Sequence, residues 1–280
     1  EKYEFVKGNI TNKRLMEEII SKCDLVVNFA AESFVDRSIS DANPFLVSNI
    51  RGAFTILDII TKQKKRMIQI STDEVFGSLS SGTATEESKL NPSSPYAATK
   101  AAAELLINSY CVTYDSDVII TRCTNNYGPR QFPEKLIPKT IILANQKRKI
   151  PIYGKGENIR DWIHVDDHCN GIMSSILDGK PGQSYNISGN NEINNITIVK
   201  KILDIMGKSE DLIEYVEDRP GHDFRYSMNS NKISKELGWK PKIRFEEGIE
   251  KTVEWYLDHE EIWKDLSPKI LDSTPWKNQL

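Results

Sequence analysis

The sequence predicts an α/β protein: a doubly wound parallel sheet with a smaller, mixed C-terminal domain. Two observations support this fold class. Short apolar runs rich in Val and Ile alternate with helical patterns in the first half, and Pro and Gly become frequent after Tyr127. Such runs are typical of strands buried on both faces of a parallel sheet. Their alternation with helices favours the doubly wound arrangement.

The same patterns predict the individual elements. Strands are expected at residues 3–6, 24–30, 67–71, 118–122 and 184–187. Helices are expected at residues 11–21, 44–61, 96–114 and 165–177, where apolar positions recur at helical spacing. We expect one domain to comprise residues 1–128 and 161–187, and the second to comprise residues 129–160 and 188–280.

The bulk composition limits the function classes. A formal net charge of -3 argues against a broad nucleic-acid surface but is compatible with small anionic ligands. No run approaches the ~18 apolar residues of a membrane span. The four cysteines form no CxxC pair, so we expect buried thiols in a reducing cytoplasm. His164 and His168 are expected to be structural, and no metal is expected, because no third ligand has suitable spacing.

Tyr96 and Lys100 lie at the start of an expected helix, in the pattern Tyr-Ala-Ala-Thr-Lys. Their i, i+4 spacing places both side chains on one helix face. A nearby ammonium group lowers the pKa of a phenol, which can then act as a base near neutral pH. This spacing also occurs on ordinary packed helices. Its position after a strand that ends in Ser-Thr-Asp-Glu favours a catalytic role.

Asp73 and Glu74 directly follow the expected strand at residues 67–71. They therefore lie at the carboxyl edge of the sheet, where ligands bind in open α/β folds. Different surroundings can separate the pKa values of two carboxyl groups, which gives one acid and one base. The alternative is a solvated turn, since Asp and Glu are common in loops.

Two further groups of residues suggest binding. Small residues within the segment 29–33, at another strand end, would let a dinucleotide approach closely, and tight strand–helix packing would require them equally. Lys135, Arg160 and Arg219 lie in segments rich in Pro and Gly, which can present cations to a diphosphate. The alternative for such scattered basic residues is an ordinary surface position.

Six segments occur together in this chain: AAESFVDRS, STDEVFG, SPYAATKAAAE, TNNYGP, FPEKLIP and DRPGHDFRY. In this combination they resemble the dTDP-glucose 4,6-dehydratases of the extended short-chain dehydrogenase/reductase superfamily, from Phe5 to about Trp255. The resemblance implies an NAD-binding Rossmann fold and a nucleotide-diphosphate sugar substrate. It also implies a cytoplasmic homodimer, formed through the helices that carry Phe54 and Leu105.

The resemblance implies a catalytic role for five residues. Tyr96 would take the O4 proton of the sugar while the C4 hydride passes to NAD, and Lys100 would hold the cofactor ribose. Thr72 would hydrogen-bond the developing 4-ketone, Glu74 would remove the C5 proton, and Asp73 would protonate the departing C6 hydroxyl. Return of the hydride to C6 gives a 4-keto-6-deoxy sugar nucleotide.

The resemblance also implies two sets of binding residues. The NAD site would contain Asn9, Ile10, Phe29, Ala30, Ala31, Glu32, Ser33, Ser48, Tyr96, Lys100 and Asn126. The nucleotide sugar would be held by Ser33, Thr72, Asn125, Lys135, Leu136, Pro151, Ile152, Tyr153, Arg160, Asn195, Asp218, Arg219, Pro220, Gly221 and His222.

The chain departs from the family pattern at three positions. Asn9 stands where Asp is usual, Phe34 where His is usual, and Phe76 where Tyr is often found. The G-x-x-G-x-x-G loop and the first βαβ unit are also missing. We therefore expect roughly fifty further residues before Glu1 in the natural protein, carrying two strands and this loop.

Other functions remain open. An epimerase would need no adjacent Asp-Glu pair, and a UDP-glucuronate decarboxylase or a GDP-mannose dehydratase is expected to have Ser in place of Asp73. A UDP-glucose dehydratase is not distinguished, because no residue that recognises the base is evident. A cofactor-binding module without catalysis predicts loss of Tyr96, Lys100 or the carboxylates, and all are present. An inactive, truncated module is the remaining version of that alternative.

Overall fold

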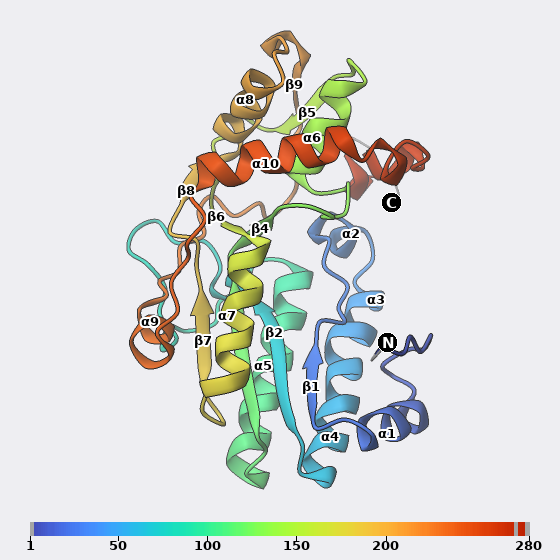
Figure 1. The fold of residues 1–280 in the computed structure, drawn as a ribbon, viewed down its shortest axis with the longest axis vertical. Coiled ribbons are helices and arrows are strands. Elements are labelled where there is room, and N and C mark those ends of the chain that lie inside the picture. Colours follow the sequence, from blue (N-terminus) through green and yellow to red (C-terminus); the bar gives the residue numbers. More distant parts are fainter. Residues whose placement is uncertain (1–2, 272–273, 278–280) are drawn as a thin grey trace.

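Three strands from the first half of the chain and one later strand form a four-stranded parallel sheet. The computed structural model describes residues 3–271 and 274–277. The strands lie in the order β1-β2-β3-β7 and point towards the second half of the chain (Figure 1). Their bounds are β1 (Leu25–Asn28), β2 (Arg66–Thr72), β3 (Val118–Cys123) and β7 (Ser184–Ile187). Four of the five expected strands and the predicted fold class are therefore confirmed.

Helices cover both faces of this sheet. The helices α4 (Ala53–Gln63) and α5 (Pro95–Tyr114) pack on one face, and α1 (Lys13–Ser21) packs against α4. The helices α7 (Val165–Asp178) and α9 (Asn231–Leu237) cover the other face. Successive strand residues point to opposite faces, so Met67 joins the cluster under α4 and Ile68 joins the cluster under α7. This burial on both sides explains the continuous apolar strand sequences.

Two expected elements are wrong in detail. Residues 3–6 form no strand, and the side chains of Tyr3 and Phe5 are 81% and 74% exposed. A strand is stable only beside another strand, and no strand of the described residues pairs with this segment. The expected helix at 44–61 is divided into α3 (Asn43–Phe45), a π-helical turn η1 (Leu46–Gly52) and α4, with the short α2 (Val35–Ser40) before it.

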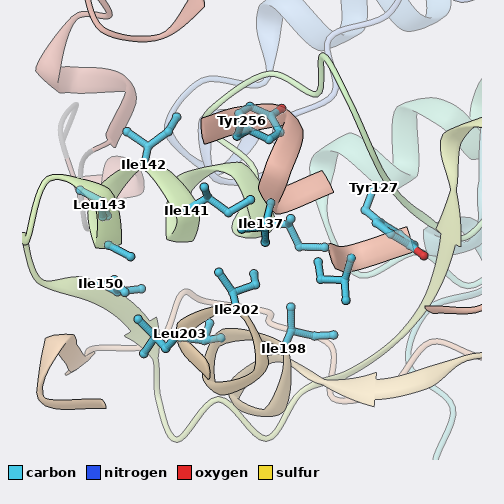
Figure 2. Packing of buried hydrophobic residues seen from close by; sticks show 14 of the residues in the cluster. Tyr127, Ile137, Ile141, Ile142, Leu143, Ile150, Ile198, Ile202, Leu203 and Tyr256 are labelled. Carbon is cyan, nitrogen blue, oxygen red and sulfur yellow. The ribbon is translucent and has the colours of Figure 1, made fainter. Parts of the chain in front are cut away.

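The second half of the chain builds its own apolar core. Figure 2 shows side chains from α6, α8 and α10 meeting there. Its helices are α6 (Leu136–Asn145), α8 (Asn195–Ile205) and α10 (Phe245–Asp258). Its strands are β4 (Asn125–Tyr127), β5 (Ile150–Tyr153), β6 (Ile159–His164), β8 (Glu192–Asn194) and β9 (Ile213–Val216). The 3-10 turns are η2 (Asp73–Phe76), η3 (Glu210–Leu212), η4 (Glu260–Ile262), η5 (Pro268–Leu271) and η6 (Pro275–Lys277).

Strand β6 lies between the two cores. Trp162 packs in the core of the second half, whereas Ile163 packs against the parallel sheet. The expected boundary between residues 160 and 161 falls within this strand. The division into two domains stays a prediction, which the separate cores support.

The cysteines are less buried than expected. Cys23, Cys111 and Cys123 are half-buried, and Cys169 is exposed, because its neighbours His168 and Ile172 take the inward face of α7. All four are free thiols. Among residues 3–271 and 274–277, no group of three or more His, Cys, Asp or Glu side chains is placed to hold a metal ion. Within the same ranges, no helix is long and apolar enough to cross a membrane.

The buried imidazole of His168 should make stability depend on pH. Burial lowers its pKa to about 4, and its Nε2 has no hydrogen-bond partner among the described residues. The unfolded chain therefore binds the proton first, so the free energy of unfolding falls as the pH decreases from about 6.5 to 4, by up to about 3 kcal/mol. Urea unfolding of the wild type and of His168→Leu across this range tests this expectation. An unchanged pH slope in the variant would contradict it.

Candidate active site

A tight acidic turn follows β2 at the carboxyl edge of the sheet; we use this term for residues 72–77. Thr72 ends the strand, and its hydroxyl accepts a hydrogen bond from the Glu74 amide at 3.3 Å. Gly77 closes the turn with φ +70°, and a Cβ there would lie 2.1 Å from the Asn91 carbonyl oxygen. The turn therefore requires glycine at its end, and it presents Asp73 and Glu74 in a defined orientation.

Helix α5 brings Tyr96 and Lys100 to the same place. Ser94 caps the helix by accepting from the Ala97 amide, and Pro95 occupies the first turn. Both side chains are buried, with 8% of Tyr96 and 6% of Lys100 exposed. The Lys100 Nζ donates to the Ile70 carbonyl of β2 at 2.6 Å. The Thr72 side chain lies near the Tyr96 phenol, where it opposes the rise of the phenol pKa. The five residues expected to be catalytic are thus gathered around the end of β2.

The two carboxyl groups of the acidic turn experience different surroundings. Burial raises the pKa of Asp73 well above its usual range, and the charges of Glu74 and Asp161 add to this. Burial also raises the pKa of Glu74, but three cations, Arg219, Arg160 and Lys135, oppose the shift. Asp73 is thereby favoured as the proton donor and Glu74 as the proton acceptor.

The phenol and the ammonium group are both shifted towards neutrality by burial. Burial raises the pKa of Tyr96 well above 10, and the nearby Glu74 carboxylate adds to the rise. Burial lowers the pKa of Lys100 to about 8, although Cys123 and Glu104 oppose this. In this structure desolvation is the largest effect on the phenol pKa, and the lowering of that pKa by Lys100 together with the nicotinamide cation stays a prediction.

A cavity of about 170 Å³ opens beside Glu74, between the sheet edge and the second half of the chain. Twelve of its lining residues were expected from the sequence, namely Ser33, Glu74, Asn125, Lys135, Leu136, Pro151, Ile152, Tyr153, Arg160, Asn195, Arg219 and His222. Of the other expected substrate residues, Thr72 accepts a hydrogen bond from the Glu74 amide, and Asp218 Oδ1 accepts one from His222 Nδ1 at 2.6 Å. Pro220 and Gly221 form the exposed turn between Arg219 and His222, outside the lining.

Asp36 lines this cavity and was missed by the sequence reasoning. It is 1% exposed and accepts hydrogen bonds at 2.7 Å from both the Tyr153 hydroxyl and the Arg219 guanidinium. It comes from α2, whereas its partners come from the second half of the chain. Its only sequence signal was its place in the segment AAESFVDRS.

Tyr226 is the second missed residue. Its hydroxyl donates to Asp223 at 2.6 Å and lies 3.4 Å from a Glu74 oxygen. The Arg160 guanidinium lies over its ring, 4.2 Å from the centroid, in a cation–π contact. Tyr226 therefore joins the acidic turn to the cations of the cavity, and its signal was its place in DRPGHDFRY.

Phe34, which stands where His is usual, has a clear role in the structure. The ammonium of Lys135 lies 5.1 Å from the centre of its ring, and the guanidinium of Arg37 lies 5.6 Å away. The ring also lines the cavity. An aromatic face here favours two cations at the mouth of the cavity.

The residues expected at the NAD site lie along the same sheet edge. The segment 29–33 follows β1 and is fixed by Asn49 of η1, which exchanges two hydrogen bonds with the Glu32 backbone. Phe29 is 59% exposed, and Ala30, Ala31 and Ser33 line this open edge. The remaining expected residues are Asn9, Ile10 and Ser48, which lie near α1 and η1. The Ile10 side chain packs so closely on Gly52 that a Cβ at position 52 would collide with it.

Asn126 gives an independent sign of a binding site here. Its side-chain oxygen is buried and has no partner among the described residues, while its amide nitrogen donates to the Thr124 carbonyl. A buried acceptor without a partner is costly and marks a position where a ligand can donate. The open segment 29–33 and this unpaired acceptor are compatible with a dinucleotide whose ring carries an amide, because the amide N–H could donate to the Asn126 oxygen.

The parallel sheet and the Tyr96–Lys100 pair on α5 define a protein of the extended short-chain dehydrogenase/reductase class. Residues 1–252 match the family described as GDP-mannose 4,6 dehydratase. A dTDP-glucose 4,6-dehydratase of Streptomyces niveus is 43% identical over 98% of this chain and 82% of its own length. The low-salt glycan biosynthesis protein Agl12 of Haloferax volcanii is 46% identical over 92% of this chain and 84% of its own length.

The fold comparison agrees with the sequence comparison. A crystal structure of a dTDP-glucose 4,6-dehydratase double mutant from Streptomyces venezuelae, with NAD bound, superposes with a TM-score of 0.93 at 42% identity. It covers 94% of this chain and 82% of its own. The chain belongs to the dTDP-glucose 4,6-dehydratase family, as the sequence motifs indicated.

Loss of the Asp36 carboxylate should destabilise the protein. Asp36→Asn leaves the buried Arg219 guanidinium without its counter-charge, so the free energy of unfolding should fall by about 3 kcal/mol. Urea denaturation measures this change. Asp58→Asn is the matched control, because the lysine partners of Asp58 are exposed and its loss should change stability far less. Equal effects of the two substitutions would contradict the role of the buried pair.

Proposed function

We propose that this protein catalyses the NAD-dependent dehydration of dTDP-glucose to the 4-keto-6-deoxy sugar nucleotide. The observation that carries the proposal is the acidic turn: Asp73 and Glu74 lie together beside Tyr96, with their pKa values separated by their surroundings. The family and its NAD-bound structures support the cofactor and the substrate class. The Asp-Glu pair favours dehydration over epimerisation, which needs no such pair.

NAD, when bound, supplies the acceptor for the C4 hydride and returns that hydride to C6. The residues that would hold it are Asn9, Ile10, Phe29, Ala30, Ala31, Glu32, Ser33, Ser48, Tyr96, Lys100 and Asn126. Lys100 would move from the Ile70 carbonyl to the ribose hydroxyls, a change that its long side chain allows. The phenolate form of Tyr96 is favoured by positive charge, which the nicotinamide ring brings.

The chain's own residues would move three protons. Tyr96 takes the proton from the sugar O4, and the Thr72 hydroxyl, which lies near the phenol, stabilises the resulting ketone oxygen. Glu74 takes the C5 proton, which the ketone makes acidic. Asp73, whose raised pKa keeps it protonated, gives its proton to the C6 hydroxyl as water leaves.

The cavity beside Glu74 would hold the nucleotide diphosphate. Three cations, Arg160, Arg219 and Lys135, line this cavity. A planar guanidinium group can donate two parallel hydrogen bonds to the oxygens of one phosphate. The substrate residues are Ser33, Thr72, Asn125, Lys135, Leu136, Pro151, Ile152, Tyr153, Arg160, Asn195, Asp218, Arg219, Pro220, Gly221 and His222. The cytoplasmic location expected from the sequence stays a prediction.

We also propose that the protein is a homodimer formed through α4 and α5. Phe54 of α4 is 41% exposed and packs edge-on against Tyr110 of α5. Leu105, Val112 and Tyr114 of α5 are 61%, 88% and 59% exposed. A row of exposed apolar side chains on adjacent helices is typical of a subunit interface.

Replacement of the acid should separate oxidation from elimination. In Asp73→Asn the amide cannot protonate the C6 hydroxyl, so formation of the 4-keto-6-deoxy product should fall by about 10²-fold or more. Oxidation at C4 should persist, since Tyr96 is intact. Product is measured by its absorbance in alkali, and oxidation by nicotinamide absorbance in a single turnover. Asp178→Asn, at an exposed position of α7, is the control. Product formation at the normal rate in Asp73→Asn would refute the acid role.

A charge on the α5 surface should prevent dimerisation. Leu105→Glu would bury an unpaired carboxylate in the proposed interface and shift the protein to monomer in sedimentation experiments. Leu177→Glu is the matched control, because Leu177 is 70% exposed on α7, on the opposite face of the sheet. If both variants sediment like the wild type, the α4–α5 interface is wrong.

A further inference from the structure

A buried ion pair lies beneath the acidic turn. Glu104 of α5 and Arg122 of β3 are 0% and 3% exposed. The Arg122 Nη2 lies 2.7 Å from Glu104 Oε2, and its Nε lies 3.1 Å from both carboxylate oxygens. Neither residue lines the cavity or touches the groups proposed to react.

This pair contacts the chain both before and after the two carboxylates of the acidic turn. Before the turn, the Ser71 hydroxyl donates to Glu104 Oε1 at 2.5 Å. After the two carboxylates, the ring of Phe76 packs on the Arg122 guanidinium, and the distance from the ring centroid to Arg122 Cζ is 4.9 Å. Residues 72–75 are therefore held between two contacts to one ion pair. This contact also accounts for an aromatic residue at position 76.

The same pair fixes α5 relative to β2. Lys100 and Glu104 are one helical turn apart. Lys100 donates to the Ile70 carbonyl of β2, and Glu104 accepts from the hydroxyl of the next residue, Ser71. The Ser71–Glu104 contact therefore ties α5, which carries Tyr96 and Lys100, to the end of β2, and it would remain when Lys100 leaves Ile70 for the cofactor ribose.

The energetics favour a role in positioning over a role in stability. A buried ion pair contributes little to folding, because apolar residues of similar volume are often equally stabilising. This pair is also incompletely satisfied, since the Arg122 Nη1 is buried with no partner among the described residues. Catalysis, in contrast, is sensitive to placement: a misplacement of about 1 Å can cost about 10²-fold in rate.

We propose that Ser71, Glu104, Arg122 and Phe76 form a positioning cluster that holds Asp73 and Glu74 in register with Tyr96 and Lys100. The inference rests on the proposed dehydratase function. Glu104 and Arg122 act through the acidic turn and α5, as positioning residues.

The decisive variant replaces both charges by apolar side chains of similar volume. Glu104→Met combined with Arg122→Met should keep the melting temperature close to that of the wild type. Its kcat should fall by about 10- to 100-fold, while KM for the nucleotide sugar changes less than about threefold, because the cavity is untouched. Hydrogen–deuterium exchange of the amides of residues 72–77 should become faster.

A milder variant removes one contact and leaves the ion pair intact. Ser71→Ala deletes only the hydroxyl that joins β2 to Glu104, so kcat should fall by a smaller factor and exchange of the acidic turn should increase. Ser175→Ala is the matched control, because it deletes a buried hydroxyl that bonds the Gly171 carbonyl within α7. That control should leave both kcat and exchange of the turn unchanged.

The outcomes separate the two roles. Wild-type kcat and wild-type exchange in the double variant would overturn the proposal. So would a fall in activity that matches only a loss of folded protein. If the double variant does not fold, Ser71→Ala decides by the same two measurements. A wild-type protein without dehydratase activity would refute the proposed function, whereas the exchange measurement would still test the cluster.

Discussion

One geometric constraint underlies the whole site: parallel strands end at the same edge of their sheet. The acidic turn follows β2, the segment 29–33 follows β1, and Asn126 follows β3. Because Thr72 and Cys123 are directly paired in the β2–β3 register, the segments that follow them must emerge side by side. Residues far apart in the chain are thereby gathered without any direct attraction between them. The apolar faces under α4 and α7 hold the strands in this arrangement.

Burial then determines the chemistry of the gathered groups. Desolvation raises the pKa values of Asp73 and Tyr96 and lowers the pKa of Lys100, so burial makes the charged form of each of these three groups less favourable. Glu74 differs because Arg219, Arg160 and Lys135 surround it. These cations come from the second half of the chain, so the separation of the two carboxyl groups into donor and acceptor depends on how that half covers the sheet edge. The buried ion pair of Glu104 and Arg122 contacts Ser71 and Phe76, on either side of the two carboxylates.

The sequence predicted well where structure is local. The strands at 25–28, 66–72, 118–123 and 184–187 were recognisable from apolar runs, and the motifs singled out five residues that the fold gathers around the end of β2. It failed where a partner decides the outcome. Residues 3–6 have strand-like composition but no neighbouring strand, and the helix at 44–61 contains a π-helical turn around Asn49. That turn coincides with the hydrogen bonds of Asn49 to Glu32 and Thr99, which no helical periodicity signals.

By itself, the sequence determined the fold class, the carboxyl-edge position of Asp73 and Glu74, and the family, because each depends on short-range patterns and motif combinations. Only the tertiary structure decided the environment of these groups. Asp36 and Arg219 are 183 residues apart, and Glu74 and Tyr226 are 152 apart, yet each pair meets in the cavity. The pKa of a buried group depends on which charges and apolar atoms surround it in space. For that reason, the sequence could give the acid role of Asp73 and the base role of Glu74 only by family resemblance, and the folded chain supplies the difference in surroundings that favours those roles.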